Sequence, residues 1–274
     1  MRVFISADIE GISGVVDGSQ TSEQGFDYGR ARRLMTGEVN AAVEGALAAG
    51  ATEVVVNDSH GSMRNILIEE LHPEAKLITG GPKPLTMMEG IDGGFDAAFF
   101  VGYHARAGTR GVLNHTISGK VVAGISLNGR TYGECGVNAA LAGRFGVPVV
   151  LVTGDSMTAA EAQSVLPGVR TVAVKEQRAR LAARCLQPEK ARHLIRAAAA
   201  EAVRVAVPNG EVKPMVVGTP AVFEIRFHNT GMADMAELVP GARRVDDLTL
   251  SFGHDDLIVA FRALRAMIYL AGVI

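Results

Sequence analysis

Four short apolar runs constrain the fold of this chain more than any other feature, because each is followed by polar residues that can bind a metal or carry a proton. The runs cover residues 3–5, 52–57, 97–102 and 147–153. Short runs rich in Val and Ile are typical of strands that are buried on both faces of a parallel sheet. Parallel strands end at one common edge, so the sequence predicts that the polar residues after them meet there.

Helical patterns lie between these runs. Residues 28–50 carry apolar side chains at helical spacing, and Asp27 is placed to cap the first turn. Strand, helix and parallel strand form a unit with a right-handed crossover. The predicted fold class is therefore α/β, with a mostly parallel, mixed sheet and helices on both faces. Further helices are predicted over 63–71, 133–145, 158–165 and 188–207, the last with Pro188 in its first turn.

Two later features depart from this alternation. Asn128-Gly129 separates two strand-like segments, which predicts a hairpin over 121–132 that adds antiparallel strands to the sheet. The segment 207–210 (Val-Pro-Asn-Gly) breaks the helical pattern. We therefore expect two parts, a metal-binding catalytic α/β domain over 1–207 and a smaller C-terminal α/β part over 208–274.

Composition excludes several classes of partner. A net charge of -2 over 274 residues gives no general attraction to nucleic acid or to an anionic membrane. No apolar stretch has the length of a membrane span, and the N-terminus enters a strand without a secretory leader. Cys135 and Cys185 follow none of the spacings of a thiolate zinc site. We expect a cytoplasmic protein with no nucleic-acid or membrane partner.

Asp8 and Glu10 follow the first apolar run at a spacing of two residues. Side chains two apart in extended backbone point to the same side, so both carboxylates are expected to face the crevice beyond the sheet. Two carboxylates held close raise one another's pKa, so such a pair usually shares a proton, a basic partner or a cation.

Other metal-binding side chains follow the later runs and open the helix at 133–145. Oxygen and imidazole ligands without a thiolate suit zinc in a hydrolytic role, or manganese, better than a structural zinc. Five such ligands can serve two divalent ions, with Asp8 placed to bridge them. The candidate ligands are Asp8, Glu10, His60, His104 and Glu134.

Several long motifs resemble one enzyme family. They are ADIEGISG, VVVNDSHGSM, EELHPEAKLITG, VGYHARAGTRGVLNH and GECGVNAALAGRFGVPVVLVTGD, and they are similar to those of the bacterial zinc-dependent D-aminopeptidases of the dipeptide-transport type. The resemblance covers nearly the whole chain. It implies two zinc ions per chain and release of N-terminal D-amino acids, such as D-Ala, from short peptides. It also implies a homo-oligomer, a decameric ring that shelters the sites.

The resemblance also assigns roles to single residues. It makes Asp8 the bridging ligand, and Glu10, His60, His104 and Glu134 the remaining ligands. His115, which follows a glycine-containing loop, falls on the catalytic histidine, as a general acid/base or as a nucleophile.

Two alternative functions remain open from the sequence. A two-metal phosphoesterase would use the same ligands together with cationic phosphate clamps, for which Arg106, Arg110 and Lys175 are available. A non-catalytic protein that binds a small ligand would use the same crevice without a metal. The metal content of the purified protein distinguishes the non-catalytic binding protein from the two hydrolases. A paired assay on D-alanyl peptides and an aryl phosphate then distinguishes the peptidase from the phosphoesterase.

Overall fold

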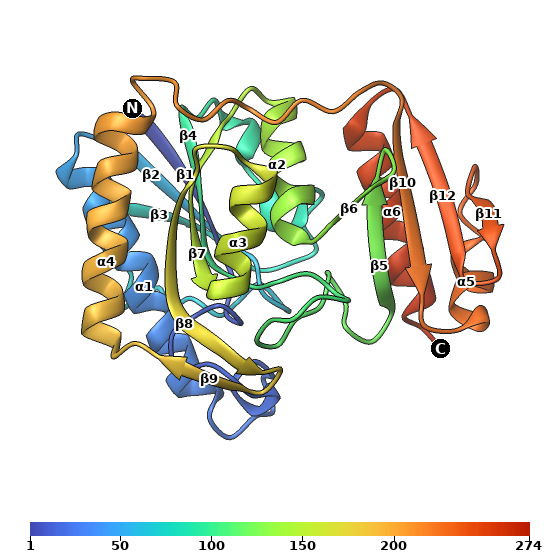
Figure 1. Ribbon diagram of the computed structural model, residues 1–274, viewed down its shortest axis with the longest axis horizontal. Coiled ribbons are helices and arrows are strands. Elements are labelled where there is room, and N and C mark those ends of the chain that lie inside the picture. Colours follow the sequence, from blue (N-terminus) through green and yellow to red (C-terminus); the bar gives the residue numbers. More distant parts are fainter.

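The strands form two separate sheets in the computed structural model, which describes residues 1–274 (Figure 1). The larger sheet has seven strands in the order β3-β2-β1-β4-β7-β8-β9. Its first six strands in this order are parallel, and only β9 is antiparallel. The mostly parallel, mixed sheet that the sequence predicts is confirmed. The strands are β1 (Arg2–Ala7), β2 (Glu53–Asp58), β3 (Ala75–Ile78), β4 (Ala97–Tyr103), β7 (Val149–Asp155), β8 (Arg170–Ala179) and β9 (Ala182–Cys185).

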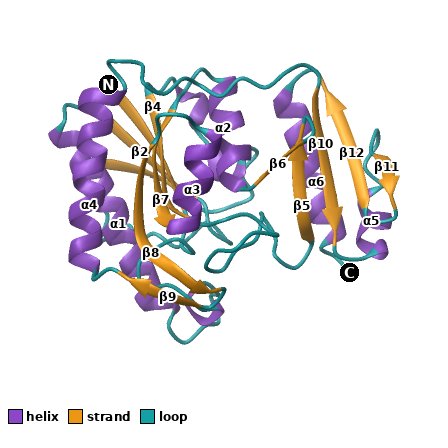
Figure 2. Ribbon diagram, viewed as in Figure 1, coloured by secondary structure: helices purple, strands orange, loops and turns teal.

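Helices cover both faces of the seven-stranded sheet (Figure 2). Successive side chains of a strand point to opposite faces, so Val3 and Ile5 of β1 join one apolar core and Phe4 joins the other. The first core includes α1 (Tyr28–Ala48) and α4 (Pro188–Glu201), which pack against each other. The second includes α2 (Glu134–Arg144) and part of α3 (Ser156–Val165).

The order of the strands places a crevice at one point of the sheet edge. From β1 the chain moves outward through β2 and β3, and it then returns to place β4 on the other side of β1. Ligands of open α/β sheets bind at the carboxyl ends of the strands where the order reverses in this way. The residues that follow β1 and β4 therefore occupy the expected position for a functional site.

The smaller sheet has five antiparallel strands in the order β11-β12-β10-β5-β6. The predicted hairpin at Asn128-Gly129 forms, but its strand β5 pairs with β10 and not with the parallel sheet, so that expectation was wrong. β10 offers an apolar face, Phe223, Ile225 and Phe227, which a hairpin strand can share. The elements are β5 (Val122–Leu127), β6 (Arg130–Tyr132), β10 (Ala221–Phe227), α5 (Thr230–Ala236), β11 (Arg243–Asp246), β12 (Thr249–His254) and α6 (Leu257–Ala271).

The five-stranded sheet thus takes residues 122–132 from the first part of the chain and all its other strands from beyond 220. The segment between η4 (Ala202–Ala206) and β10 runs along one side of the molecule and links the two parts (Figure 1). The boundary at 208 stays a prediction. It lies in this connecting segment and does not coincide with the division between the sheets.

Two local expectations fail for identifiable reasons. Residues 63–71 form turns and no helix, because the buried Asp58 carboxylate accepts hydrogen bonds from the backbone N–H groups of Asn65 and Ile66 and holds this segment against the end of β2. Asp27 precedes α1 but caps it with no side-chain hydrogen bond. Its carboxylate accepts a hydrogen bond from Gln20 instead.

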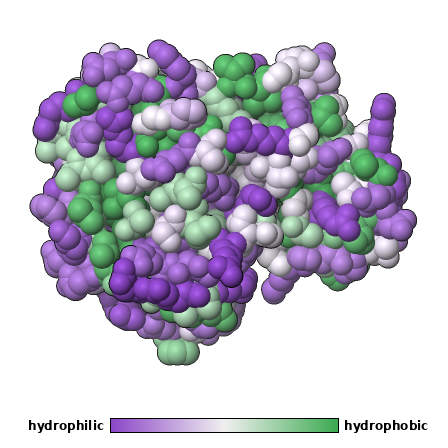
Figure 3. Space-filling view, viewed as in Figure 1, coloured by the Kyte–Doolittle hydropathy of each residue, from purple (hydrophilic) through white to green (hydrophobic).

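The surface is mainly hydrophilic on the face shown in Figure 3, where a notch lies between the two parts of the molecule. None of the helices combines the length and the apolar character that a membrane span requires.

Candidate metal centre

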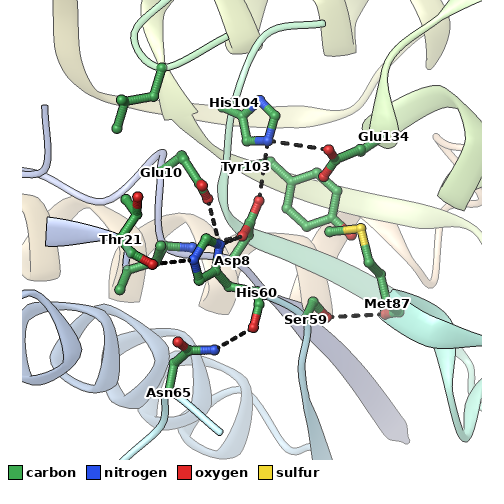
Figure 4. A network of polar contacts seen from close by, with 12 residues as sticks. Asp8, Glu10, Thr21, Ser59, His60, Asn65, Met87, Tyr103, His104 and Glu134 are labelled. Carbon is green, nitrogen blue, oxygen red and sulfur yellow. Dashed lines mark hydrogen bonds and ion pairs between the residues drawn. The ribbon is translucent and has the colours of Figure 1, made fainter. Parts of the chain in front are cut away.

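The structure brings together all six residues that the sequence singles out. Asp8 and Glu10 follow β1, His60 follows β2, His104 follows β4, and Glu134 is the first residue of α2. Figure 4 shows these five side chains pointing toward one another. His115 reaches the same place from the loop between β4 and β5, where its ring stacks on that of His104 with centroids 4.1 Å apart.

Two overlapping groups of metal-binding atoms share His104. Asp8, Glu10 and His104 form one group, and His104, His115 and Glu134 form the other, with the atoms of each group within 4.8 Å of one another. His104 Nε2 lies 3.5 Å from Asp8 Oδ2 and 3.4 Å from Glu134 Oε1. The arrangement offers two adjacent positions for cations.

His60 and His115 contact different carboxylates of this cluster. His60 Nδ1 is 3.3 Å from Asp8 Oδ1 and 2.9 Å from Glu10 Oε2 (Figure 4). His115 Nε2 is 3.8 Å from Glu134 Oε1. The imidazole of His115 is the more exposed of the two, at 21% against 14% for His60. His115 therefore has both the proximity of a ligand and the accessibility of a proton carrier.

Each of the three imidazoles is oriented by a backbone carbonyl. His60 Nε2 bonds the Thr21 carbonyl at 2.7 Å, His104 Nδ1 the Ala105 carbonyl at 3.0 Å, and His115 Nδ1 the Leu113 carbonyl at 2.9 Å. When the N–H of one ring nitrogen donates to a carbonyl, the other nitrogen keeps its lone pair, and here that nitrogen faces the carboxylates. Metal-binding histidines are held in this way.

His104 carries the clearest mark of a cation site. Its Nε2 is buried and has no hydrogen-bond partner, although two carboxylates lie close to it. A buried polar atom without a partner is costly, so such an atom in a native site calls for an explanation such as an unseen ion. A divalent cation between His104, Asp8 and Glu134 would satisfy it.

Electrostatics agrees with this interpretation. Burial, followed by repulsion from Glu10, raises the pKa of Asp8 to about 7. Burial by itself would lower the pKa of His104, but attraction to Glu134, Asp8 and Glu10 together outweighs it and raises that pKa to about 10. Burial likewise opposes ionisation of Glu134, yet His104, His115 and the Ile117 N–H together lower its pKa to about 2. The buried carboxylates thus stabilise positive charge between them, whether protons or metal ions carry it.

Glycine allows the loop after β1 to approach β4. A side chain at Gly11 would lie 1.9 Å from the Tyr103 carbonyl oxygen, and Gly102 has a positive φ of 73° with the Asp8 carbonyl against it. Hydrogen bonds join Gly11 N to Gly102 O and Asp8 N to Val101 O, both at 2.8 Å. The two glycines therefore bring the carboxylates beside His104.

The loop that carries His115 has unusual backbone geometry. Leu113 and Ile117, each two residues from His115, have positive φ angles of 53° and 62°. This region is uncommon for any residue with a side chain and a clear outlier for a β-branched one. Ile117 N donates a hydrogen bond of 2.6 Å to Glu134 Oε1, so the outlier is held by a candidate ligand. Such outliers cluster at functional sites.

Three buried charged residues that the sequence left without a role at the metal site support these loops. Asp58 holds the segment that follows His60, as described above. Asp155 caps α3 and accepts a hydrogen bond from Val112 N, close to His115 in the chain. Lys175 donates to the carbonyls of Glu10, Ile12 and Val15. Asp58 and Asp155 lie at strand ends, as the sequence predicts, whereas Lys175 lies within β8. The sequence did not show that all three side chains turn toward backbone groups.

A cavity of about 150 Å³ opens onto the cluster. Asp8, His60, His115 and Glu134 lie on one side, and Phe261 and Arg265 of α6 belong to its wall. The cationic residues proposed as phosphate clamps do not line it, and Lys175 is turned to backbone carbonyls. None of the three clamps that the sequence offered for a phosphoesterase therefore faces the cavity. The other lining residues are Ser59, Gly61, Met63, Thr86, Met87, Ile117, Val137 and Asn138.

The chain is similar to known proteins in both sequence and structure. The family model described as D-aminopeptidase matches residues 1–266. The chain is 42% identical to a D-aminopeptidase of Bacillus subtilis over 276 residues, which are 99% of this chain and 98% of that protein. It is also similar to the solved structure of the Zn-dependent D-aminopeptidase DppA from Bacillus subtilis, described as a self-compartmentalizing protease. That match has a TM-score of 0.96 and 40% identity, and covers 100% of this chain and 99% of the other.

Proposed function

The chain belongs to the D-aminopeptidase family, as its motifs predicted, and we propose that it removes N-terminal D-residues such as D-alanine from short peptides with two zinc ions per chain. The observation that carries this proposal is the cluster around His104, where two groups of three metal-binding side chains share one imidazole at the end of β4. Its position at the switch point of the sheet supports a catalytic site over a structural one.

The donor set fits zinc. Three carboxylates and three imidazoles, with no thiolate, are ligands that catalytic zinc accepts, and the two positive ions would offset the buried negative charge. Asp8, Glu10, His60, His104 and Glu134 would hold the ions, with Asp8 as the bridging ligand that the motifs imply. In support, the Asp8 carboxylate lies 3.3 Å from His60 Nδ1 and 3.5 Å from His104 Nε2. When bound there, zinc supplies Lewis acidity toward a peptide carbonyl and toward water.

His115 is the residue that we assign to proton transfer. Its Nδ1 is fixed by the Leu113 carbonyl, so Nε2 is free to accept a proton from the attacking water and to return it to the leaving amine. Burial, and after it the neighbouring His104, lowers the pKa of His115, which keeps the imidazole neutral and able to accept a proton at neutral pH.

The cavity supports a small substrate. Its volume of about 150 Å³ is below the range of about 300–1,000 Å³ of sites for drug-sized ligands. Met63, Ile117 and Val137 supply apolar wall for short side chains, and zinc would receive the free amine of a peptide. A long or folded chain does not fit this space.

We also propose that the chain assembles into a closed homo-oligomer, a decamer as the motifs imply. The structurally similar DppA is described as self-compartmentalizing. Phe26, at the end of the polar segment after β1, is 94% exposed, and Val273 and Ile274 beyond α6 are 68% and 63% exposed. Exposed apolar side chains of this kind are candidates for contacts between copies. A monomeric mass at micromolar concentration would contradict the assembly.

The proposal is tested on purified protein by metal analysis and by a paired assay. We expect about two zinc ions per chain, release of D-alanine from a D-alanyl dipeptide, and much slower release from the L-alanyl dipeptide. An aryl phosphate serves as the control substrate and should not be cleaved. Protein that binds no added zinc, or that prefers the aryl phosphate, would overturn the assignment.

A further inference from the structure

Arg265 is an unpaired cation in the wall of the catalytic cavity. It lies on α6, which packs against the five-stranded sheet and contacts α2 (Figure 1). It shares the cavity with Asp8, His60, His115 and Glu134. No carboxylate lies within ion-pair distance of its guanidinium. Its Nε is buried and has no hydrogen-bond partner.

The side chain is held in a fixed position. Nη2 donates a hydrogen bond of 2.9 Å to the Tyr269 hydroxyl, and the guanidinium lies over the Tyr269 ring, 4.7 Å from its centroid. Phe261, Arg265 and Tyr269 are each four residues apart, so they form one row along α6. The row orients the guanidinium while Nε and its neighbouring N–H groups remain available.

A guanidinium edge with a free Nε matches the two oxygens of a carboxylate, which it binds through parallel hydrogen bonds. The opposite side of the cavity holds the candidate metal ligands, and the carboxylates of Asp8 and Glu134 line it. The cavity therefore has a metal-binding end and a guanidinium end with apolar wall between them. A short peptide matches both ends, because its free amine and scissile carbonyl suit zinc and its C-terminal carboxylate suits the guanidinium.

We propose that Arg265 binds the C-terminal carboxylate of the substrate, so that the enzyme selects short peptides with a free C-terminus. The inference rests on the proposed peptidase function and adds to it the residue that reads the far end of the substrate. Cavity size agrees, since a space of about 150 Å³ is on the order of that which admits a benzene molecule in an engineered protein.

Separate measurements of substrate binding and of turnover test the proposed role of Arg265. The ligands are a D-alanyl dipeptide and its C-terminal amide, which differ only in the terminal charge. Binding is measured by calorimetry on zinc-loaded His115→Ala protein, with and without Arg265→Met. We expect the acid to bind about 10- to 100-fold more tightly than the amide, the scale of a hydrogen bond to a charged group. Arg265→Met should bring that ratio close to one, and Arg265→Lys should keep part of it.

Arg262→Met is the matched control, because Arg262 is an exposed arginine of the same helix that does not line the cavity. It should keep the full preference for the acid. Equal binding of acid and amide, or a preference that survives Arg265→Met, overturns the inference. A change in native mass on Arg265→Met without a change in preference also overturns it, since Arg265 would then contact another copy of the chain. Failure of the wild-type enzyme to release D-alanine would contradict the proposed peptidase function. The role of Arg265 would still be decided by the binding measurements alone.

Discussion

The two sheets make different contributions to one site. The seven-stranded parallel sheet supplies the metal-binding and proton-carrying side chains from loops and a helix at the ends of its strands. The five-stranded antiparallel sheet supplies no such group, but its helix α6 closes the cavity with Phe261 and Arg265. The difference suggests that the first region determines the chemistry and the second determines which substrate is accepted.

Removal of His104 should have the largest effect, since both groups of metal-binding atoms include it. We expect His104→Ala to lose zinc and to reduce turnover by more than the roughly 10²–10⁴-fold attributed to a single general acid/base. Zinc per chain and kcat on a D-alanyl dipeptide are the measurements. His193→Ala, which changes an exposed histidine of α4, is the control. A His104→Ala protein with full zinc and normal turnover would disprove the metal site.

His115→Ala should separate chemistry from metal binding within the same region. We expect it to keep its zinc and to lose about 10²–10⁴-fold in kcat, the usual contribution of a positioned acid/base. The two quantities are measured in one sample. Loss of zinc together with turnover would make His115 a ligand, as its proximity to His104 and Glu134 permits. Near-normal kcat would remove it from the mechanism.

Lys175→Met tests whether the Lys175 ammonium group holds the loop that carries Glu10 in place. Its ammonium group satisfies three carbonyls of the loop that carries Glu10. A buried acceptor left without a partner costs about 1–3 kcal/mol, and loss of a group that orients a ligand reduces metal affinity by about 10–100-fold. We expect a free energy of unfolding lower by about 3 kcal/mol and weaker zinc binding. Lys120→Met, at an exposed lysine, should change neither, and a variant as stable as wild type would refute the role.

Glu38→Gln should remove a pH-dependent loss of stability at the loop that follows β1. Burial raises the pKa of Glu38 from 4.5 to about 7, and its carboxylate accepts a hydrogen bond from Ser13 N, which glutamine can also accept. Between these pH values the unfolded chain loses this proton while the folded chain keeps it, so wild-type stability falls as pH rises.

The variant lacks this penalty, so its stability relative to wild type should increase from pH 4.5 to 7. The shift corresponds to at most about 3 kcal/mol. Denaturant unfolding at pH 5 and pH 8 measures it. A difference that does not change with pH would show that Glu38 is ionised in the folded protein throughout.

Phe261→Leu should have the smallest effect and affect substrate binding more than chemistry. Phe261 is buried and lines the cavity beside Arg265. Loss of contact worth about one methylene group, about 0.8 kcal/mol, should raise KM by roughly fourfold and leave kcat nearly unchanged. Phe252→Leu on β12, outside the cavity, is the matched control. A fall in kcat with constant KM would contradict the division of roles between the two regions.

The sequence predicted more of the first region than of the second. Asp8, Glu10, His60 and His104 follow apolar runs, and strand ends can be recognised from local pattern alone. Glu134 was visible at the start of a helix, and His115 was assigned by the resemblance to a family. Arg265 had no such signal, because it lies within an apolar helix pattern that indicates only packing.

Local periodicity determined the parallel sheet, its helices and the residues at its edge, because each of these depends on neighbours close in the chain. The partners of elements far apart in sequence were decided by tertiary packing. The hairpin at 122–132 joined β10 because an apolar face was available there. In the same way, α6 brought Arg265 to the cavity, and burial turned Lys175 toward backbone carbonyls. Long-range contacts of this kind depend on which surfaces complement each other in three dimensions, and one sequence does not record that.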